Sequence, residues 1–183
     1  MIRSLLIILV LAISCFGQTN VGGIITADIT WDQTGSPYLV TANTLIDSGV
    51  TVTIEAGVLI KIDSNTSINI FGELIAIGNE GNRIVFTSNQ TSPVSGDWGQ
   101  INFVNGVDAQ FDSPDSDLNF DRHYVSGSIL KYVTIQYGGY GDPSGALYLL
   151  NTVPYLDNVI IANNLGSGIY GINSGKTLTI NKS

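Results

Sequence analysis

The sequence predicts an all-β protein wound as a parallel β-solenoid, and three observations lead to this fold class. Short β-rich segments follow one another between Val52 and Phe103, namely VTIEAG, VLIKID, SINIFG, ELIAIG, RIVFTS and WGQINF. No segment of helical period lies between them. The close spacing of strands of about five residues is what a chain needs to wind into coils that stack on one another.

Each strand of such a solenoid should point apolar side chains toward the axis. About three segments make one coil of roughly 20 to 26 residues, so we expect a single-stranded solenoid of roughly seven coils. The residues predicted to point inward are Ile54, Ile60, Ile70, Ile75, Phe86, Ile101, Ile135, Leu149, Ile161, Ile169 and Ile180.

Residues 1–17 have the pattern of a secretory signal peptide, with Arg3 followed by the apolar run Leu5 to Ile13 and then small residues. We favour cleavage after Gly17, and the alternative is a lipoprotein-type cleavage before Cys15 with lipid added to that cysteine. Both predict a secreted or outer cell-surface location. The first removes the only cysteine, and would exclude disulfides and cysteine-based metal sites from the mature chain.

The rest of the chain is predicted to form one domain. Residues 18–49 are expected to be an N-terminal cap with the first strands, because an open terminal coil exposes backbone groups that would pair with another chain. Residues 50–183 are expected to be the β-helix. Its last residues stop within the repeat pattern, so we expect a truncated C-terminal end with a missing C-terminal domain, or else end-to-end self-association.

The charge of the chain excludes one class of partner. The net charge is −8 with only seven basic residues, which argues against a surface that follows nucleic acid phosphates. Acidity favours solubility outside the cell, with divalent cations or neutral glycans as partners.

Glycine and asparagine are predicted to shape the coils. Glycines at segment ends would form sharp corners; these are Gly72, Gly78, Gly138, Gly139, Gly166, Gly168, Gly171 and Gly175. Asparagines in or beside strands could form hydrogen-bonded ladders from coil to coil; these are Asn69, Asn102, Asn163, Asn164, Asn173 and Asn181.

The order of several segments carries a family resemblance. The runs ITADITW, VTVTIEAGVLIKI, GELIAIG and RIVFTS, followed by GDWGQINF and SILKYVTIQYGG, resemble the secreted right-handed parallel β-helix repeat proteins of Bacteroidetes-type bacteria. The resemblance implies a right-handed, pectate-lyase-like solenoid on a secreted or surface protein. It does not imply lyase activity, because the same scaffold also carries adhesins and structural coats.

A polar stretch interrupts the pattern between Phe103 and Ser128 and suggests a metal site. Carboxylates at short spacing could bind Ca²⁺, and an ordinary solvated loop is the alternative. The residues concerned are Asp108, Asp112, Asp115, Asp117 and Asp121. No other cofactor is predicted.

A polysaccharide lyase on this scaffold would need a base that abstracts a proton next to a carboxylate, and a cation that neutralises that carboxylate. Lys131 is the candidate base and Arg122 the candidate charge partner. The alternative is that Lys131 is a solvent-facing residue of an alternating strand.

Tyrosines in the second half of the chain suggest a binding surface. Outward rings on successive coils would combine apolar faces with hydroxyls, as sugar rings require. We predict such a stripe from Tyr132, Tyr148 and Tyr170.

Together these observations predict a non-enzymatic secreted or cell-surface β-solenoid module that is adhesive, glycan-binding or structural. Its partner would be a polysaccharide or the extracellular matrix. The alternative function is a polysaccharide lyase acting on acidic glycans.

Overall fold

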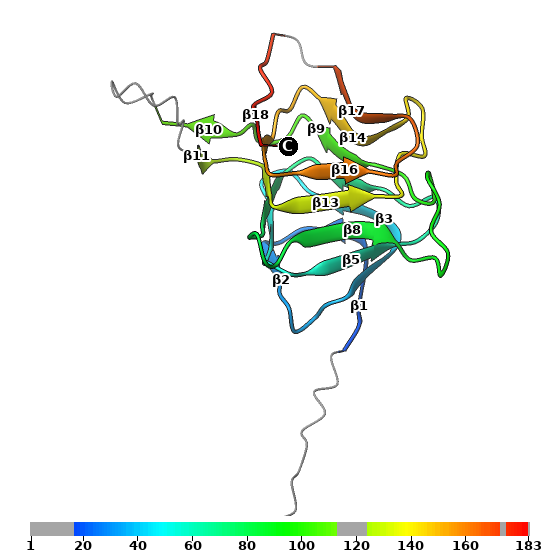
Figure 1. The fold of residues 1–183 in the computed structure, drawn as a ribbon. Helices are drawn as coiled ribbons and strands as arrows, with labels where there is room; N and C mark the ends of the chain where they lie inside the picture. Colours follow the sequence, from blue (N-terminus) through cyan, green and yellow to red (C-terminus); the bar gives the residue numbers. More distant parts are fainter. Residues whose placement is uncertain (1–16, 113–123, 173–174, 183) are drawn as a thin grey trace, which may run out of the picture.

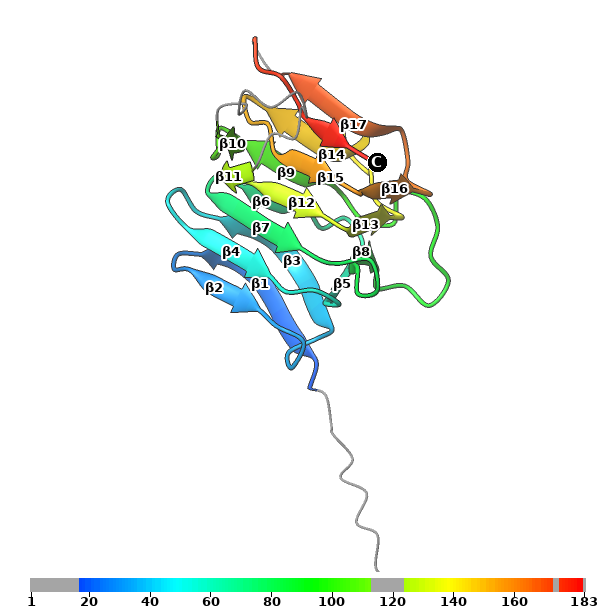
Figure 2. The same cartoon turned by 60° about the vertical axis from the view of Figure 1, so that its left-hand side comes forward.

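The computed structural model describes residues 17–112, 124–172 and 175–182. Within these residues the chain forms β-strands and no helix, so none could cross a membrane as a helix. Parallel pairing stacks the strands into three faces around a common core (Figures 1 and 2). This arrangement is the right-handed parallel β-helix that the sequence predicts.

The three faces are built from strands that recur in a fixed order along the chain. Face 1 contains β2 (Ile29–Trp31), β4 (Thr51–Ile54), β7 (Glu73–Ile77), β12 (Ile129–Lys131), β15 (Tyr155–Asp157) and β18 (Ile180–Asn181). Face 2 contains the first part of β3 (Tyr38–Ile46), β5 (Leu59–Ile62), β8 (Ile84–Ser88), β13 (Val133–Gln136) and β16 (Ile160–Ala162). Face 3 contains the last part of β3, β6 (Ile68–Ile70), β9 (Ile101–Val104), β14 (Gly145–Leu150) and β17 (Ser167–Ile172).

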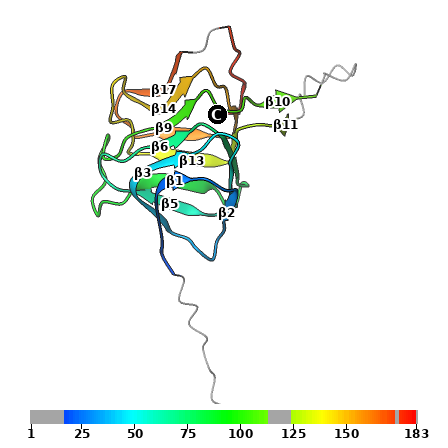
Figure 3. The same ribbon diagram turned by 180° about the vertical axis from the view of Figure 1, so that it is seen from behind.

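Five complete coils can be followed in the described residues, each giving one strand to every face. Before them, β1 (Thr19–Ile25) pairs in parallel with both parts of β3 (Figure 3), and after them β18 continues face 1. The predicted number of roughly seven coils is therefore not confirmed. The coil length agrees with the prediction, since Val52 pairs with Leu74, 22 residues later, and Leu130 with Leu156, 26 residues later.

The core is a stack of large apolar side chains that alternate with outward residues along each strand, as a strand period of two requires. Isoleucine and phenylalanine fill it because β-branched and aromatic side chains suit a pleated, buried surface. Seven of the predicted inward residues are at most 1% exposed: Ile54, Ile60, Ile70, Phe86, Ile101, Ile135 and Leu149.

Two predicted inward residues are wrong. In β7 the buried residues are Leu74 and Ala76, and Ile75 lies half-buried on the outer surface. Ile180 is 51% exposed because β18 has a neighbouring strand on one side only. Ile161 and Ile169 are intermediate, partly buried and packed against the core.

Asparagines turn the corners more often than the sequence suggests. Five take positive φ, the left-handed conformation that asparagine tolerates better than most residues; these are Asn65, Asn105, Asn151, Asn158 and Asn163. Asn163, predicted for a ladder, is thus a corner residue. Gly72 serves a close approach instead, since a Cβ atom there would lie 2.2 Å from the carbonyl oxygen of Val50.

One excursion leaves the solenoid between β9 and β12. Its described parts are the short antiparallel strands β10 (Gln110–Phe111) and β11 (Tyr124–Ser126). Figure 1 shows this pair projecting sideways from the stack of coils. It occupies the polar interruption seen in the sequence, and it lies at one edge of face 1 (Figure 2).

Candidate functional site

The outer surface of face 3 brings two of the predicted tyrosines together. Tyr148 in β14 pairs in register with Tyr170 in β17. Their rings stack 6.0 Å apart and within 8° of parallel. Tyr170 is 38% exposed and Tyr148 is half-buried. This pair is the part of the predicted stripe that the geometry supports.

A second outward column runs beside the tyrosines. Leu150 in β14 pairs with Ile172 in β17, and both lie two residues beyond the tyrosines of their strands. Leu150 is half-buried and Ile172 is 47% exposed. Tyr148, Tyr170, Leu150 and Ile172 therefore form one continuous outward surface, called here the face 3 strip. The sequence analysis missed Leu150 and Ile172, although their position in the strand period could have indicated them.

An asparagine ladder continues the tyrosine column toward the N-terminus. Asn69, Asn102 and Tyr148 follow one another in register on β6, β9 and β14. The Asn102 amide nitrogen donates to the Asn69 side-chain oxygen over 2.9 Å, which confirms that part of the predicted ladder. The buried side-chain oxygen of Asn102 has no hydrogen-bond partner. The ladder ends there because the next residue in the column is a tyrosine.

Tyr132 does not belong to the stripe, and this part of the prediction is wrong. It is the single residue between β12 and β13, at the corner of faces 1 and 2, with φ of 49°. The Arg83 guanidinium lies over its ring, 5.8 Å from the ring centre. Tyr132 therefore lies at a corner that face 3 does not share.

Lys131 lies on face 1 in an ion pair. Its Nζ atom is 3.1 Å from a carboxylate oxygen of Asp157, whose side chain is 6% exposed. The hydrogen bond with Asp157 raises the pKa of Lys131 above its ordinary value of 10.5. A general base must be unprotonated to accept a proton, so this pairing works against the role predicted for Lys131. Arg122, its predicted partner, lies outside the described residues.

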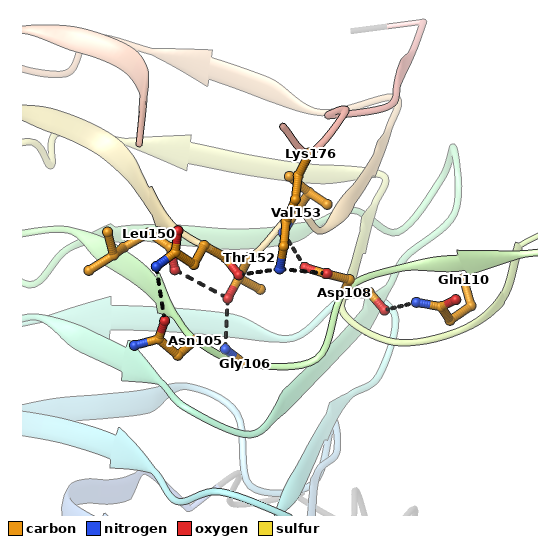
Figure 4. A network of polar contacts seen from close by, with 9 residues as sticks. Asn105, Gly106, Asp108, Gln110, Leu150, Thr152, Val153 and Lys176 are labelled. Carbon is orange, nitrogen blue, oxygen red and sulfur yellow. Dashed lines mark hydrogen bonds and ion pairs between the residues drawn. The ribbon is translucent and has the colours of Figure 1, made fainter. Parts of the chain in front are cut away.

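The predicted calcium ligands are only partly described. Asp108 contacts the coil above (Figure 4), where its carboxylate accepts the Val153 N–H over 2.9 Å and pairs with Lys176 Nζ at 2.7 Å. Asp112 is exposed directly after β10. Asp115, Asp117 and Asp121 lie outside the described residues. In the described part of the chain no three acidic, histidine or cysteine side chains are grouped as metal ligands, and calcium binding stays a prediction.

The fold and its three faces are those of a pectate-lyase-like solenoid, and a comparison with family models gives the same result. The family model described as "Pectate-lyase like beta helix domain" matches residues 23–146. The chain belongs to this family. The match ends within β14, before Tyr148, so it covers the scaffold and not the face 3 strip. The comparisons with curated proteins and with solved structures found no match.

Proposed function

We propose that this chain is a non-enzymatic β-solenoid module that binds neutral glycans on the face 3 strip. As an exported protein with the predicted signal peptide, it would attach a secreted or cell-surface protein to polysaccharide or matrix. The observation that carries the proposal is the pair of parallel rings of Tyr148 and Tyr170 on a solvent-facing sheet surface.

The chemistry of the strip suits a sugar. Pyranose rings have apolar C–H faces and hydroxyl edges, and tyrosine offers an apolar ring with a polar tip. Leu150 and Ile172 extend the apolar area beside the rings. The strip contains no ionisable carboxylate or amine, which favours an uncharged glycan over an acidic one.

The rigid sheet favours binding without large ordering costs. Tyr148 and Tyr170 are fixed to neighbouring strands by the register of β14 and β17, and Leu149 between them in sequence is 1% exposed in the core. A surface that is already ordered before binding loses little conformational entropy when the ligand arrives.

The lyase alternative would require a neutral amine at Lys131. Its pairing with Asp157 and its raised pKa favour the protonated form at neutral pH. The test is the appearance of an unsaturated sugar product, followed by absorbance, when the purified chain meets an acidic polysaccharide. Turnover that is lost in Lys131→Ala would establish the enzyme and overturn the non-enzymatic proposal.

The binding proposal is tested by affinity electrophoresis in gels that contain β-glucan, mannan or xylan. At least one of these glycans should retard the chain, and Tyr170→Ala should lower the affinity by about tenfold, as loss of roughly 1.4 kcal/mol of ring contact would. Tyr140→Ala is the matched control, because Tyr140 is 56% exposed in the loop between β13 and β14. Equal retardation of all three proteins would contradict the proposal.

A further inference from the structure

Face 1 contains a groove that none of the predicted sites includes. A cavity of about 480 Å³ lies on the outer surface of β7, β12, β15 and β18. Tyr124 of β11 borders it, at the edge of face 1 where the excursion leaves the solenoid (Figure 2). The groove and the face 3 strip are thus on different faces of the solenoid.

Aromatic side chains form one side of this groove. The Tyr124 ring lies 6.3 Å from that of Tyr155 and within 17° of parallel. The Phe111 ring meets Tyr155 edge to face at 5.1 Å, and the Tyr124 hydroxyl donates to the Gly127 carbonyl. Burial raises the pKa of Tyr124 to about 12, so this wall stays uncharged and fixed.

The floor of the groove holds a carboxylate whose charge is used within the protein. Asp157 pairs with Lys131 and also accepts the side-chain amides of Asn158 over 2.8 Å and Asn181 over 3.0 Å. Three donors on one buried carboxylate leave it little capacity to attract a ligand cation. Lys131 keeps 39% of its side chain exposed beside it, with further N–H donors to offer.

A second cation lies in the same groove. Lys182 is exposed and lines the cavity together with Lys131. Two ammonium groups against one carboxylate give the groove a net charge of +1. The chain as a whole has a net charge of −8, so this is a local reversal of sign. Such a reversal beside aromatic rings indicates a ligand that combines a ring with a single negative charge.

We infer that the face 1 groove binds a saccharide bearing a sulfate ester, as a site separate from the face 3 strip. The tyrosines would contact the sugar ring, and Lys131 and Lys182 would donate to the sulfate oxygens. Lysine offers a compact point charge with rotatable donors, whereas planar carboxylates are matched by the arginine fork. A sulfate ester carries one charge and three oxygens arranged around a tetrahedral centre, which suits two separate ammonium groups.

The test uses calorimetric titration with a sulfated galactan oligosaccharide, its desulfated form and an oligogalacturonate. The expected result is binding of the sulfated oligosaccharide that weakens with added salt and at least about tenfold weaker binding of the desulfated form. Lys182→Gln should lower the affinity for the sulfated form by about tenfold. Lys61→Gln is the matched control, since Lys61 is an outward lysine of β5 on face 2.

The variants also separate this site from the proposed function. Tyr170→Ala should leave binding of the sulfated oligosaccharide unchanged while it weakens binding of neutral glycan. Equal affinity for the sulfated and desulfated forms, or an unchanged affinity in Lys182→Gln, would overturn the inference. Tighter binding of the oligogalacturonate than of the sulfated form would overturn the choice of sulfate. No binding of any of the three would overturn the site and leave the face 3 strip untouched.

Discussion

The inward direction of β7 gives a sharp test of the coil register. Leu74 is 2% exposed in the core, and Ile75 is half-buried on the outer surface of face 1. Truncating a fully buried leucine removes its transfer free energy and leaves a cavity, at a cost of about 3 to 5 kcal/mol. We therefore expect Leu74→Ala to lower the free energy of unfolding by that amount. Ile75→Ala opens no core cavity and should cost about 1 kcal/mol.

Urea unfolding followed by circular dichroism measures both variants. With a slope of about 2 kcal/mol per molar urea, the midpoint should fall by about 1.5 to 2.5 M in Leu74→Ala and by about 0.5 M in Ile75→Ala. A one-residue slip in register would exchange the two faces of the strand. A larger loss in Ile75→Ala than in Leu74→Ala would therefore refute the register and favour the direction first predicted from the sequence.

Two further predictions concern charge and backbone. Because the folded-state pKa of Lys131 is raised above 10.5, its pairing with Asp157 stabilises the fold fully below that pH and less as pH rises through the folded pKa. Thermal unfolding from about pH 9 to pH 12 should show a steeper loss in the wild type than in Asp157→Asn, and parallel curves would contradict the pairing. Gly139 has φ of 98° and a Cβ atom there would lie 2.2 Å from the Leu165 carbonyl oxygen, so Gly139→Ala should cost about 3 kcal/mol in urea unfolding, against about 1 kcal/mol for Gly49→Ala. Gly49 also has positive φ but nothing within 4 Å, and equal losses would argue against the close contact.

The solenoid could be predicted because each of its requirements is local in the sequence. Strands such as VTIEAG and VLIKID alternate cleanly, so Ile54 and Ile60 were correctly predicted to be buried. The segment ELIAIG is apolar at nearly every position. Its alternation therefore gives no direction, and only pairing with β4 and β12 decides that Leu74 points inward.

The site was harder to predict because it depends on which residues share a column. The sequence indicates outward tyrosines, but the number of residues between coils varies with the loops. Asn69 pairs with Asn102, 33 residues later, and Asn102 with Tyr148, 46 residues later. Tyr132 was wrongly placed in the stripe because a tyrosine with positive φ at a one-residue corner has no recognisable sequence pattern. The groove on face 1 depends on an excursion whose direction the sequence does not specify.

Tyr148→Asn offers a variant that should separate binding from folding. An asparagine at this position would extend the ladder and donate to the unpartnered Asn102 oxygen. Satisfying a buried acceptor stabilises by about 1 to 3 kcal/mol, which offsets the loss of the ring pair with Tyr170, worth about 0.5 to 1.5 kcal/mol. We expect the melting temperature to stay within about 5 °C of the wild type.

The most direct test is calorimetric titration of the wild type and Tyr148→Asn with the neutral glycan that retards the chain most strongly. The account predicts binding heat for the wild type and a loss of affinity of at least about tenfold for a folded Tyr148→Asn. Equal affinity of the two proteins, with both folded at the temperature of the titration, would contradict the claim that the face 3 strip binds glycans.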